Sequence, residues 1–203
     1  MITTIMNEIT TLDTELFYTI NGARNNFFDW FFAIISSHLF FGIVLVSLIL
    51  WLSFTQFRRR FWVLLILVAL CFLLADRLSV VCFKDVVQRL RPSHALANVH
   101  LVKLRDFGLI YGSKGGLYGF VSSHAANVFC LSTVFALVAE KKRRKILIPI
   151  FAIWSLLTIY SRVYCGVHYP GDVICGSLLG IVLGLIIFYA YRFIIGRLDH
   201  NKN

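Results

Sequence analysis

The chain has 203 residues, of which 59% are hydrophobic and only 15% are charged, and its formal net charge is +10. This composition excludes a soluble domain, and with it the nucleic-acid partner that such a charge would otherwise suggest. The basic residues gather in short loops between apolar runs, which is typical of a single polytopic domain embedded in a lipid bilayer.

The N-terminal 37 residues are predicted to lie at the membrane surface. Between residues 4 and 20, apolar side chains recur at helical spacing with acidic residues between them, which predicts an amphipathic helix. Residues 27–36 are rich in aromatic side chains and are predicted to be interfacial or continuous with the first span. We therefore divide the chain into an interfacial segment, residues 1–37, and a transmembrane domain, residues 38–198.

Five apolar stretches have the length that a helix needs to cross ~30 Å of hydrocarbon. They predict an all-α transmembrane helix bundle of five spans, or six if the N-terminal segment also crosses. The second span is predicted to continue helically toward Arg89 and to end at Pro92, since the residue before a proline is pushed out of the helical region. The predicted spans are residues 38–55, 61–83, 120–139, 146–164 and 170–195.

The orientation of the bundle follows from its two densest basic loops. Arg58 to Arg60 follow the first span and Lys141 to Lys145 follow the third, so both loops lie on one side, which is predicted to be the cytoplasm. The C-terminus, with Arg192, Arg197 and Lys202, is predicted to return to that side. Three polar clusters then gather on the opposite, periplasmic face of the cytoplasmic (inner) membrane.

The first polar cluster, Lys84 to Pro92, offers two cations to one pocket. Lys84 and Arg91 are seven residues apart, close to two helical turns, so both can face the same side of a helix. A lysine point charge and the planar fork of an arginine suit phosphate oxygens. An interfacial anchor is the alternative explanation for such residues, and it describes Arg89 best.

The second cluster stands at the predicted N-terminus of the third span. Ser122, Ser123 and His124 lie there, where free backbone N–H groups and the helix dipole favour an anion. A capping serine beside an interfacial histidine would explain the same residues.

The third cluster connects the last two spans. Arg162 lies near the end of one span, and His168 and Asp172 bracket the turn into the next, four residues apart. That spacing lets a carboxylate hold one imidazole nitrogen and leaves the other as an electron donor, which can attack phosphorus or act as a base. A structural hydrogen bond is the usual explanation for such a pair on its own, but it does not explain the assembly of all three clusters on one face.

Taken in order, these residues resemble the PAP2 superfamily of type 2 phosphatidic acid phosphatases. The motifs of that family are Lys-x6-Arg-Pro, Pro-Ser-Gly-His and Ser-Arg-x5-His-x3-Asp. The first and third are intact here, at Lys84 to Pro92 and Ser161 to Asp172. The second reads VSSH, with Val121 and Ser123 in place of proline and glycine. The resemblance covers roughly residues 60 to 195.

The resemblance implies a phosphatase that forms a phosphohistidine and needs no metal or other cofactor. In this scheme His168 is the nucleophile, Asp172 orients it, and His124 protonates the leaving group. The groups that would hold the phosphate are Lys84, Arg91, Ser122 and Arg162. Ser123 stands where the family has glycine, and its hydroxyl is a further candidate donor to the phosphate.

We therefore predict an integral membrane lipid phosphatase whose partners are the bilayer and a phosphorylated lipid. Undecaprenyl diphosphate, lipid A phosphates and phosphatidylglycerol phosphate are the candidate substrates, and the short, compact chain favours the prenyl diphosphate. Lys103, Arg105 and Lys114 in the long polar connection, residues 93–118, are candidate headgroup contacts, although a solvated basic loop explains them equally well. The sequence also leaves open transfer of the phosphate to a second lipid and, because of the altered VSSH motif, a catalytically silent lipid-binding protein.

Overall fold

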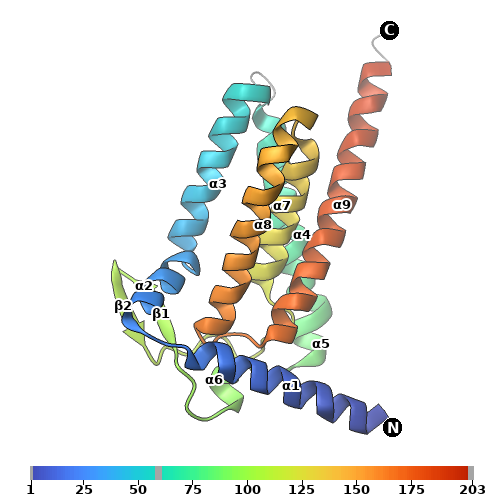
Figure 1. Ribbon diagram of the computed structural model, residues 1–203. Coiled ribbons are helices and arrows are strands. Elements are labelled where there is room, and N and C mark those ends of the chain that lie inside the picture. Colours follow the sequence, from blue (N-terminus) through green and yellow to red (C-terminus); the bar gives the residue numbers. More distant parts are fainter. Residues whose placement is uncertain (1, 58–60, 201–203) are drawn as a thin grey trace.

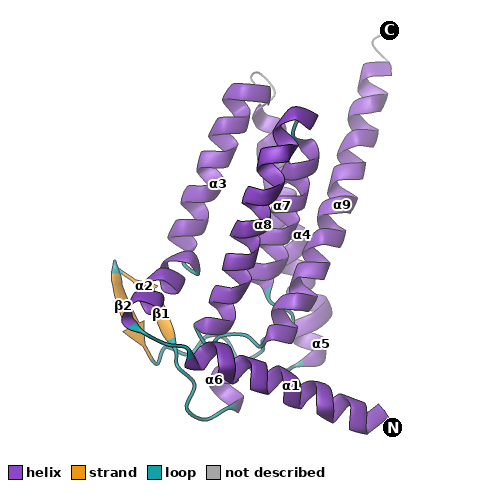
Figure 2. Cartoon of the chain, viewed as in Figure 1, coloured by secondary structure: helices purple, strands orange, loops and turns teal. Residues whose placement is uncertain are grey.

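The computed structural model describes residues 2–57 and 61–200 of the chain. Long helices stand side by side as a bundle above a layer of short elements at one end (Figure 1). Helices make up most of the described chain, loops connect them, and its two strands form one hairpin (Figure 2). This architecture confirms the predicted transmembrane helix bundle. Arg58 to Arg60 of the first basic loop, and Lys202, lie outside the described residues.

Five of the described helices form the bundle. A π-helical segment, η1 (Ser53–Phe57), continues the first of them, and η3 (Ser79–Lys84) followed by α5 (Asp85–Val87) continues the second. Four of the five runs are long and apolar enough to cross a bilayer, whereas α7 has only 16 residues. The bundle helices are α3 (His38–Leu52), α4 (Phe61–Leu78), α7 (Ser123–Val138), α8 (Lys141–Tyr164) and α9 (Pro170–His200).

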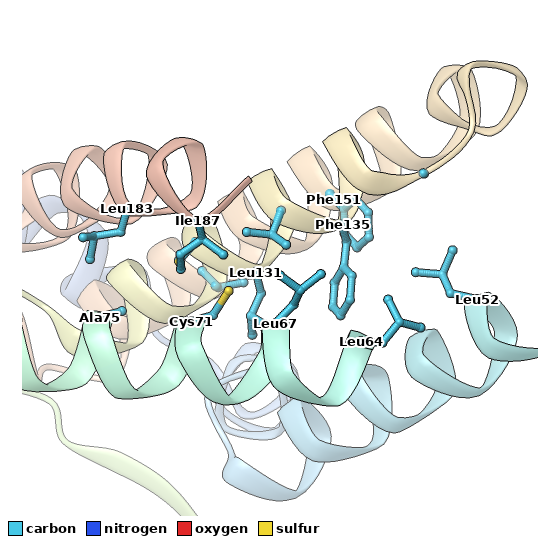
Figure 3. Close-up of a cluster of buried hydrophobic side chains, with 14 of the residues drawn as sticks. Leu52, Leu64, Leu67, Cys71, Ala75, Leu131, Phe135, Phe151, Leu183 and Ile187 are labelled. Carbon is cyan, nitrogen blue, oxygen red and sulfur yellow. The ribbon is translucent and has the colours of Figure 1, made fainter. Parts of the chain in front are cut away.

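The short helix α7 forms the centre of the bundle, with α4, α8 and α9 packed around it (Figure 1). Its Leu131 and Phe135 meet Leu67 and Cys71 of α4 and Ile187 of α9 in one buried cluster (Figure 3). Helices in a bilayer gain little from excluding water, so close van der Waals packing of this kind holds them together.

Glycines let α9 approach α7 closely. Gly176, Gly180 and Gly184 recur every fourth residue along the face of α9 that meets α7. A Cβ atom added at Gly180 would lie 2.4 Å from the carbonyl oxygen of Ala126, which is too close for any side chain. The crossing therefore depends on small residues, as helix contacts in membranes commonly do.

We expect Gly180→Ala to lower the melting temperature, because the atom it meets is backbone and cannot move aside cheaply. Overpacking of this kind costs about 1–3 kcal/mol. Gly42→Ala is the matched control, since a Cβ there meets nothing within 4 Å, and it should hold or raise the melting temperature. Thermal unfolding in detergent compares the two variants, and equal melting temperatures would contradict the tight crossing.

The second predicted span ends differently from the prediction. The helical run stops before Gln88, which has a left-handed backbone conformation with φ of 51°. Proline at position 92 then opens the short helix α6 (Pro92–Ala95) instead of ending the span, a position where its fixed φ suits a helix start. The prediction that Lys84 and Arg91 share one helix was therefore wrong, because the chain turns between them.

The polar connection, residues 93–118, contains a hairpin that the sequence did not reveal. Strands β1 (Val102–Arg105) and β2 (Gly108–Tyr111) pair antiparallel. Their turn uses Asp106 and Phe107 in the left-handed region, with φ of 49° and 62°. Hairpin turns of this kind usually carry Asn-Gly or Asp-Gly, so Asp-Phe gives no such signal.

A buried carboxylate braces this hairpin against the bundle. Asp29, in α2 (Asn26–Ile35), accepts hydrogen bonds from the hydroxyl groups of Tyr164 at 2.7 Å and Tyr111 at 3.2 Å. Its Oδ1 also lies 2.9 Å from Nε2 of His100. The brace joins α2, α8 and the polar connection at one end of the bundle.

The remaining long helix, α1 (Ile2–Gly22), lies across that same end (Figure 1). It buries Phe17 completely against the bundle and leaves Ile9, Leu12 and Leu16 more than half exposed. An amphipathic helix with an exposed apolar stripe is typical of a helix that rests at a membrane interface.

The opposite end of the bundle carries the second of the two predicted basic loops. Lys141 to Lys145 form the first turns of α8, so the prediction that they form a loop was wrong. Arg143 donates a hydrogen bond to the carbonyl of Thr55 at 3.0 Å, and Gln56 donates one to that of Val138 at 2.9 Å. The segments beside both basic clusters therefore meet, and the three polar clusters lie at the other end (Figure 1).

Candidate active site

A cavity of about 1010 Å³ opens at the end of the bundle that holds the three polar clusters. The junction of α2 and α3, helix α4, the hairpin, the start of α7 and the end of α8 all contribute to its wall. Ser122 and Asp172 are the two predicted site residues that do not line it. The predicted residues that do are Lys84, Arg91, Lys103, Arg105, Lys114, Ser123, His124, Arg162 and His168.

The imidazole of His168 is buried in the turn between α8 and α9. Its Nδ1 lies 3.4 Å from Oδ2 of Asp172, in the first turn of α9. This is a close polar contact, somewhat longer than a hydrogen bond. Asp172 is fully buried, and its Oδ2 also accepts a hydrogen bond from the backbone N–H of Tyr169 at 3.1 Å. With Nδ1 on the carboxylate side, Nε2 is the nitrogen left for a substrate.

Three cations surround this histidine, and each is held by a different part of the chain. Lys84 donates a hydrogen bond to Oγ of Ser123 at 2.6 Å, and that hydroxyl is 2.7 Å from the hydroxyl of Ser79. The serine that replaces the glycine of the family motif therefore contacts the motif lysine directly. Since both Lys84 and Ser123 line the cavity, the substitution adds a polar group to the cavity wall beside Lys84.

Arg91 is held by the segment that precedes α7. Its Nε donates to the carbonyl of Tyr118 at 3.1 Å. A Cβ atom at Gly115 would lie 2.5 Å from Nη1 of this arginine, so any side chain there would force the guanidinium group to shift.

Arg162 is oriented by the C-cap of α2. Its Nη1 donates to Oγ of Ser36 and, at 3.4 Å, to the carbonyl of the same residue. Its buried Nε has no hydrogen-bond partner among the described residues. Ser36 was not predicted as a site residue, because nothing in its local sequence links it to a residue 126 positions away.

The start of α7 supplies a second histidine. His124 lies in the first turn, with its ring centroid 5.1 Å from that of His38 on α3. Ser122 is the N-cap: its hydroxyl accepts from the N–H of Ala125 at 3.5 Å, and its own N–H donates to the carbonyl of Asp172 at 3.0 Å. Ser122 thus supports the site from behind the cavity wall, and its predicted contact with phosphate stays a prediction.

Arg89 belongs to the site, although it was predicted to be an interfacial anchor. Its Nη1 donates to Oδ1 of Asp172 at 3.0 Å, and its Nη2 donates to Oδ2 of Asp13 at 2.6 Å. The guanidinium group also lies 3.9 Å above the ring of Tyr169. The anchor prediction was wrong because the left-handed turn at Gln88 directs this arginine inward.

The three candidate headgroup contacts lie at the rim of the cavity. Lys103 and Arg105 extend from β1, and Lys114 follows β2. Arg105 is 3.5 Å from Asp106, but both side chains are largely exposed, and such pairs contribute little to stability. A basic rim of this kind can contact an anionic or sugar headgroup.

Electrostatics keep the buried imidazole neutral. Burial, followed by the charges of Arg162, Arg91 and Lys84, lowers the pKa of His168 well below its usual range. Each effect disfavours the protonated ring, so at neutral pH His168 keeps the electron pair that a nucleophile needs.

Fold and site together define an integral membrane protein that presents three cations and a buried His–Asp pair to one cavity. Residues 70–195 match the PAP2 superfamily. Over 190 residues the chain is 31% identical to a lipid A 4′-phosphatase of Porphyromonas gingivalis, an alignment that covers 93% of this chain and 76% of that protein. The chain belongs to the PAP2 superfamily.

Two solved structures resemble the fold. The crystal structure of LpxE from Aquifex aeolicus superposes with a TM-score of 0.60 at 28% identity, and the match covers 88% of this chain and 95% of that one. A transmembrane PAP2-type phosphatidylglycerolphosphate phosphatase from Bacillus subtilis gives a TM-score of 0.69 at 22% identity, covering 93% and 88%. At 22% identity, the second match shows only that the two chains share a fold.

Proposed function

We propose that this protein is a membrane lipid phosphatase that removes a phosphate monoester through a phosphohistidine intermediate. The observation that carries the proposal is the convergence of Lys84, Arg91 and Arg162 on one cavity beside the buried pair of His168 and Asp172. Phosphoryl transfer depends mainly on positioning and on neutralising oxygen charge, and this arrangement supplies both.

The reaction has two displacement steps. Nε2 of His168 attacks phosphorus, the bond from phosphorus to the lipid oxygen breaks, and that oxygen takes a proton from His124. Water then attacks phosphorus and gives a proton back to His124, the bond from phosphorus to Nε2 of His168 breaks, and inorganic phosphate leaves. Asp172 holds the ring so that the attacking nitrogen faces the phosphate, and the three cations stabilise the charge that develops on its oxygens.

The proposed substrate class is a lipid A type phosphate. The similarity to a lipid A 4′-phosphatase over nearly the whole chain supports this choice, and the cavity is large enough and its rim basic enough for a phosphorylated sugar headgroup. The prenyl diphosphate that the sequence favours stays a prediction and is the second substrate to test.

We also propose that the site opens on the periplasmic face of the inner membrane, with the C-terminus in the cytoplasm. The positive-inside rule supports this orientation, because the basic start of α8 lies at the end of the bundle opposite the cavity. A reporter fused to the C-terminus should read as cytoplasmic, and a periplasmic reading would invert the orientation.

The function is tested by phosphate release from purified protein in detergent. The panel contains lipid A, undecaprenyl diphosphate and phosphatidylglycerol phosphate, each labelled in the phosphate. We expect the label in inorganic phosphate, released fastest from lipid A. Label on a second lipid would instead indicate phosphotransfer, and no loss of label from any member would leave only a lipid-binding role.

We expect the acid limb of the pH profile of kcat/KM to lie well below the ordinary titration range of a histidine. The reason is that the essential group is neutral His168, whose pKa is lowered by burial and by its cations, so activity persists as the pH falls until that lowered pKa is reached. Removing one cation with Lys84→Ala should move the limb to higher pH, and the substrate's own ionisation is the same in both measurements. A limb that does not move would contradict this electrostatic account.

A further inference from the structure

The amphipathic helix α1 reaches the active site from outside the cavity. Asp13, in the middle of α1, does not line the cavity. Its Oδ1 accepts a hydrogen bond from the backbone N–H of Gly171 at 2.7 Å, and its Oδ2 accepts one from Nη2 of Arg89 at 2.6 Å. One carboxylate therefore holds both a charged side chain and the backbone immediately before Asp172.

Arg89 carries this contact inward to the catalytic carboxylate. Its other terminal nitrogen, Nη1, donates to Oδ1 of Asp172 at 3.0 Å. The side chains of Asp13 and Arg89 are 11% and 25% exposed, whereas that of Asp172 is fully buried. Oδ1 of Asp172 is thus bound by Arg89, while Oδ2 is bound by the N–H of Tyr169 and faces His168.

We infer that Asp13 and Arg89 are positioning residues for the pair of His168 and Asp172, an inference that rests on the proposed function. A fully buried carboxylate is costly unless it is paired and hydrogen-bonded, and Arg89 supplies both conditions. Asp13 in turn fixes the guanidinium group of Arg89. Neither residue lines the cavity, so they act through the carboxylate that orients the nucleophile.

The contacts of Asp13 with Gly171 and Arg89 are close and specific. A Cβ atom at Gly171 would lie 2.9 Å from Oδ2 and 3.3 Å from Cγ of Asp13, so a side chain there would displace the carboxylate. The guanidinium group of Arg89 is further confined by the ring of Tyr169, 3.9 Å away. On the same helix Glu15 is exposed and takes no part in these contacts.

The test compares Asp13→Asn with Glu15→Gln, two charge removals two residues apart on one helix. Asp13→Asn keeps the size of the side chain but loses the charge that holds Arg89. We expect kcat for phosphate release to fall about 10- to 100-fold with KM unchanged, as for a small misplacement of reacting groups. Glu15→Gln should match the wild type, and Asp13→Glu should recover part of the lost kcat.

A merely structural role would give a different pattern. If Asp13→Asn has the kcat of Glu15→Gln, or if Asp13→Glu is as impaired as Asp13→Asn, the inference is overturned. Where Asp13→Asn does not give a monodisperse protein, Gly171→Ala decides instead, because it displaces the carboxylate without removing it. A loss of kcat in that variant supports the inference, and wild-type kcat refutes it.

Binding of inorganic orthovanadate, measured by calorimetry, separates this inference from the proposed function. This transition-state analogue needs the oriented histidine but no lipid. If the wild type releases phosphate from no lipid, yet Asp13→Asn binds orthovanadate more weakly than Glu15→Gln does, the proposed function fails and the positioning role stands. If lipid phosphate is released and both variants match the wild type in kcat and orthovanadate binding, only the positioning role fails.

Discussion

His168→Ala is expected to reduce phosphate release about 10⁴-fold or more, the scale on which loss of a catalytic nucleophile acts. The side chain is buried between Asp172 and three cations, and among the described residues that line the cavity no other imidazole is paired with a carboxylate. The variant should also incorporate no label when it is mixed with labelled lipid and quenched. Single-turnover phosphate release and label trapping measure the two effects.

The same variant should still bind inorganic phosphate. Lys84, Arg91 and Arg162 all remain, and the alanine leaves a smaller side chain among them. Product binding, measured by calorimetry, therefore serves as the control for a folded site. Phosphate release above about a tenth of the wild-type rate would remove His168 from the nucleophile's role and return the catalytically silent alternative to consideration.

The helix bundle and the position of its polar clusters were predictable because a bilayer imposes strict local rules. Every backbone polar group must be paired within a segment, so spanning elements appear as apolar runs of one length. Charge bias then indicates which ends of the runs lie together. These two constraints predicted that Lys84, Arg91, Arg162 and His168 lie at one end of the bundle, and all four line the cavity there.

What the sequence could not reveal depends on contacts between distant segments. Arg89 was misassigned because its role requires the turn at Gln88 and a carboxylate 76 residues earlier in the chain. Ser36 and Asp13 were missed for the same reason, since a lone serine or an acid on an amphipathic helix is ordinary in its own segment. The hairpin was missed because its turn lacks the usual glycine.

The surroundings of the VSSH motif accommodate its serine, Ser123, at the position where the family motif has glycine. The family motif has glycine at this position, which allows the backbone to come close to a phosphate. A serine side chain in its place could have prevented that close approach. Here the hydroxyl of Ser123 instead lies between Lys84 and Ser79, at 2.6 Å and 2.7 Å. The serine thus joins the polar wall of the cavity, which supports retained activity.

Arg162→Lys is expected to lower kcat/KM about 10²- to 10³-fold although it keeps the positive charge, since removal of one preorganised donor from a transition state has this effect. The guanidinium group is held by Ser36 through Nη1, which fixes the plane of its fork. A lysine has one flexible ammonium group and cannot both bond Ser36 and present two parallel donors to phosphate oxygens. Steady-state phosphate release from lipid A measures the loss.

The companion variant Ser36→Ala tests the orientation alone. It retains the charge and the fork of Arg162 but removes the hydroxyl that aligns them, so its loss should be smaller than that of Arg162→Lys. Arg192→Lys, on the exposed surface of α9 far from the cavity, is the matched control and should leave kcat/KM unchanged. If Arg162→Lys stays within a few-fold of the wild type, charge alone suffices at this position. The planar fork then has no part in stabilising the transition state.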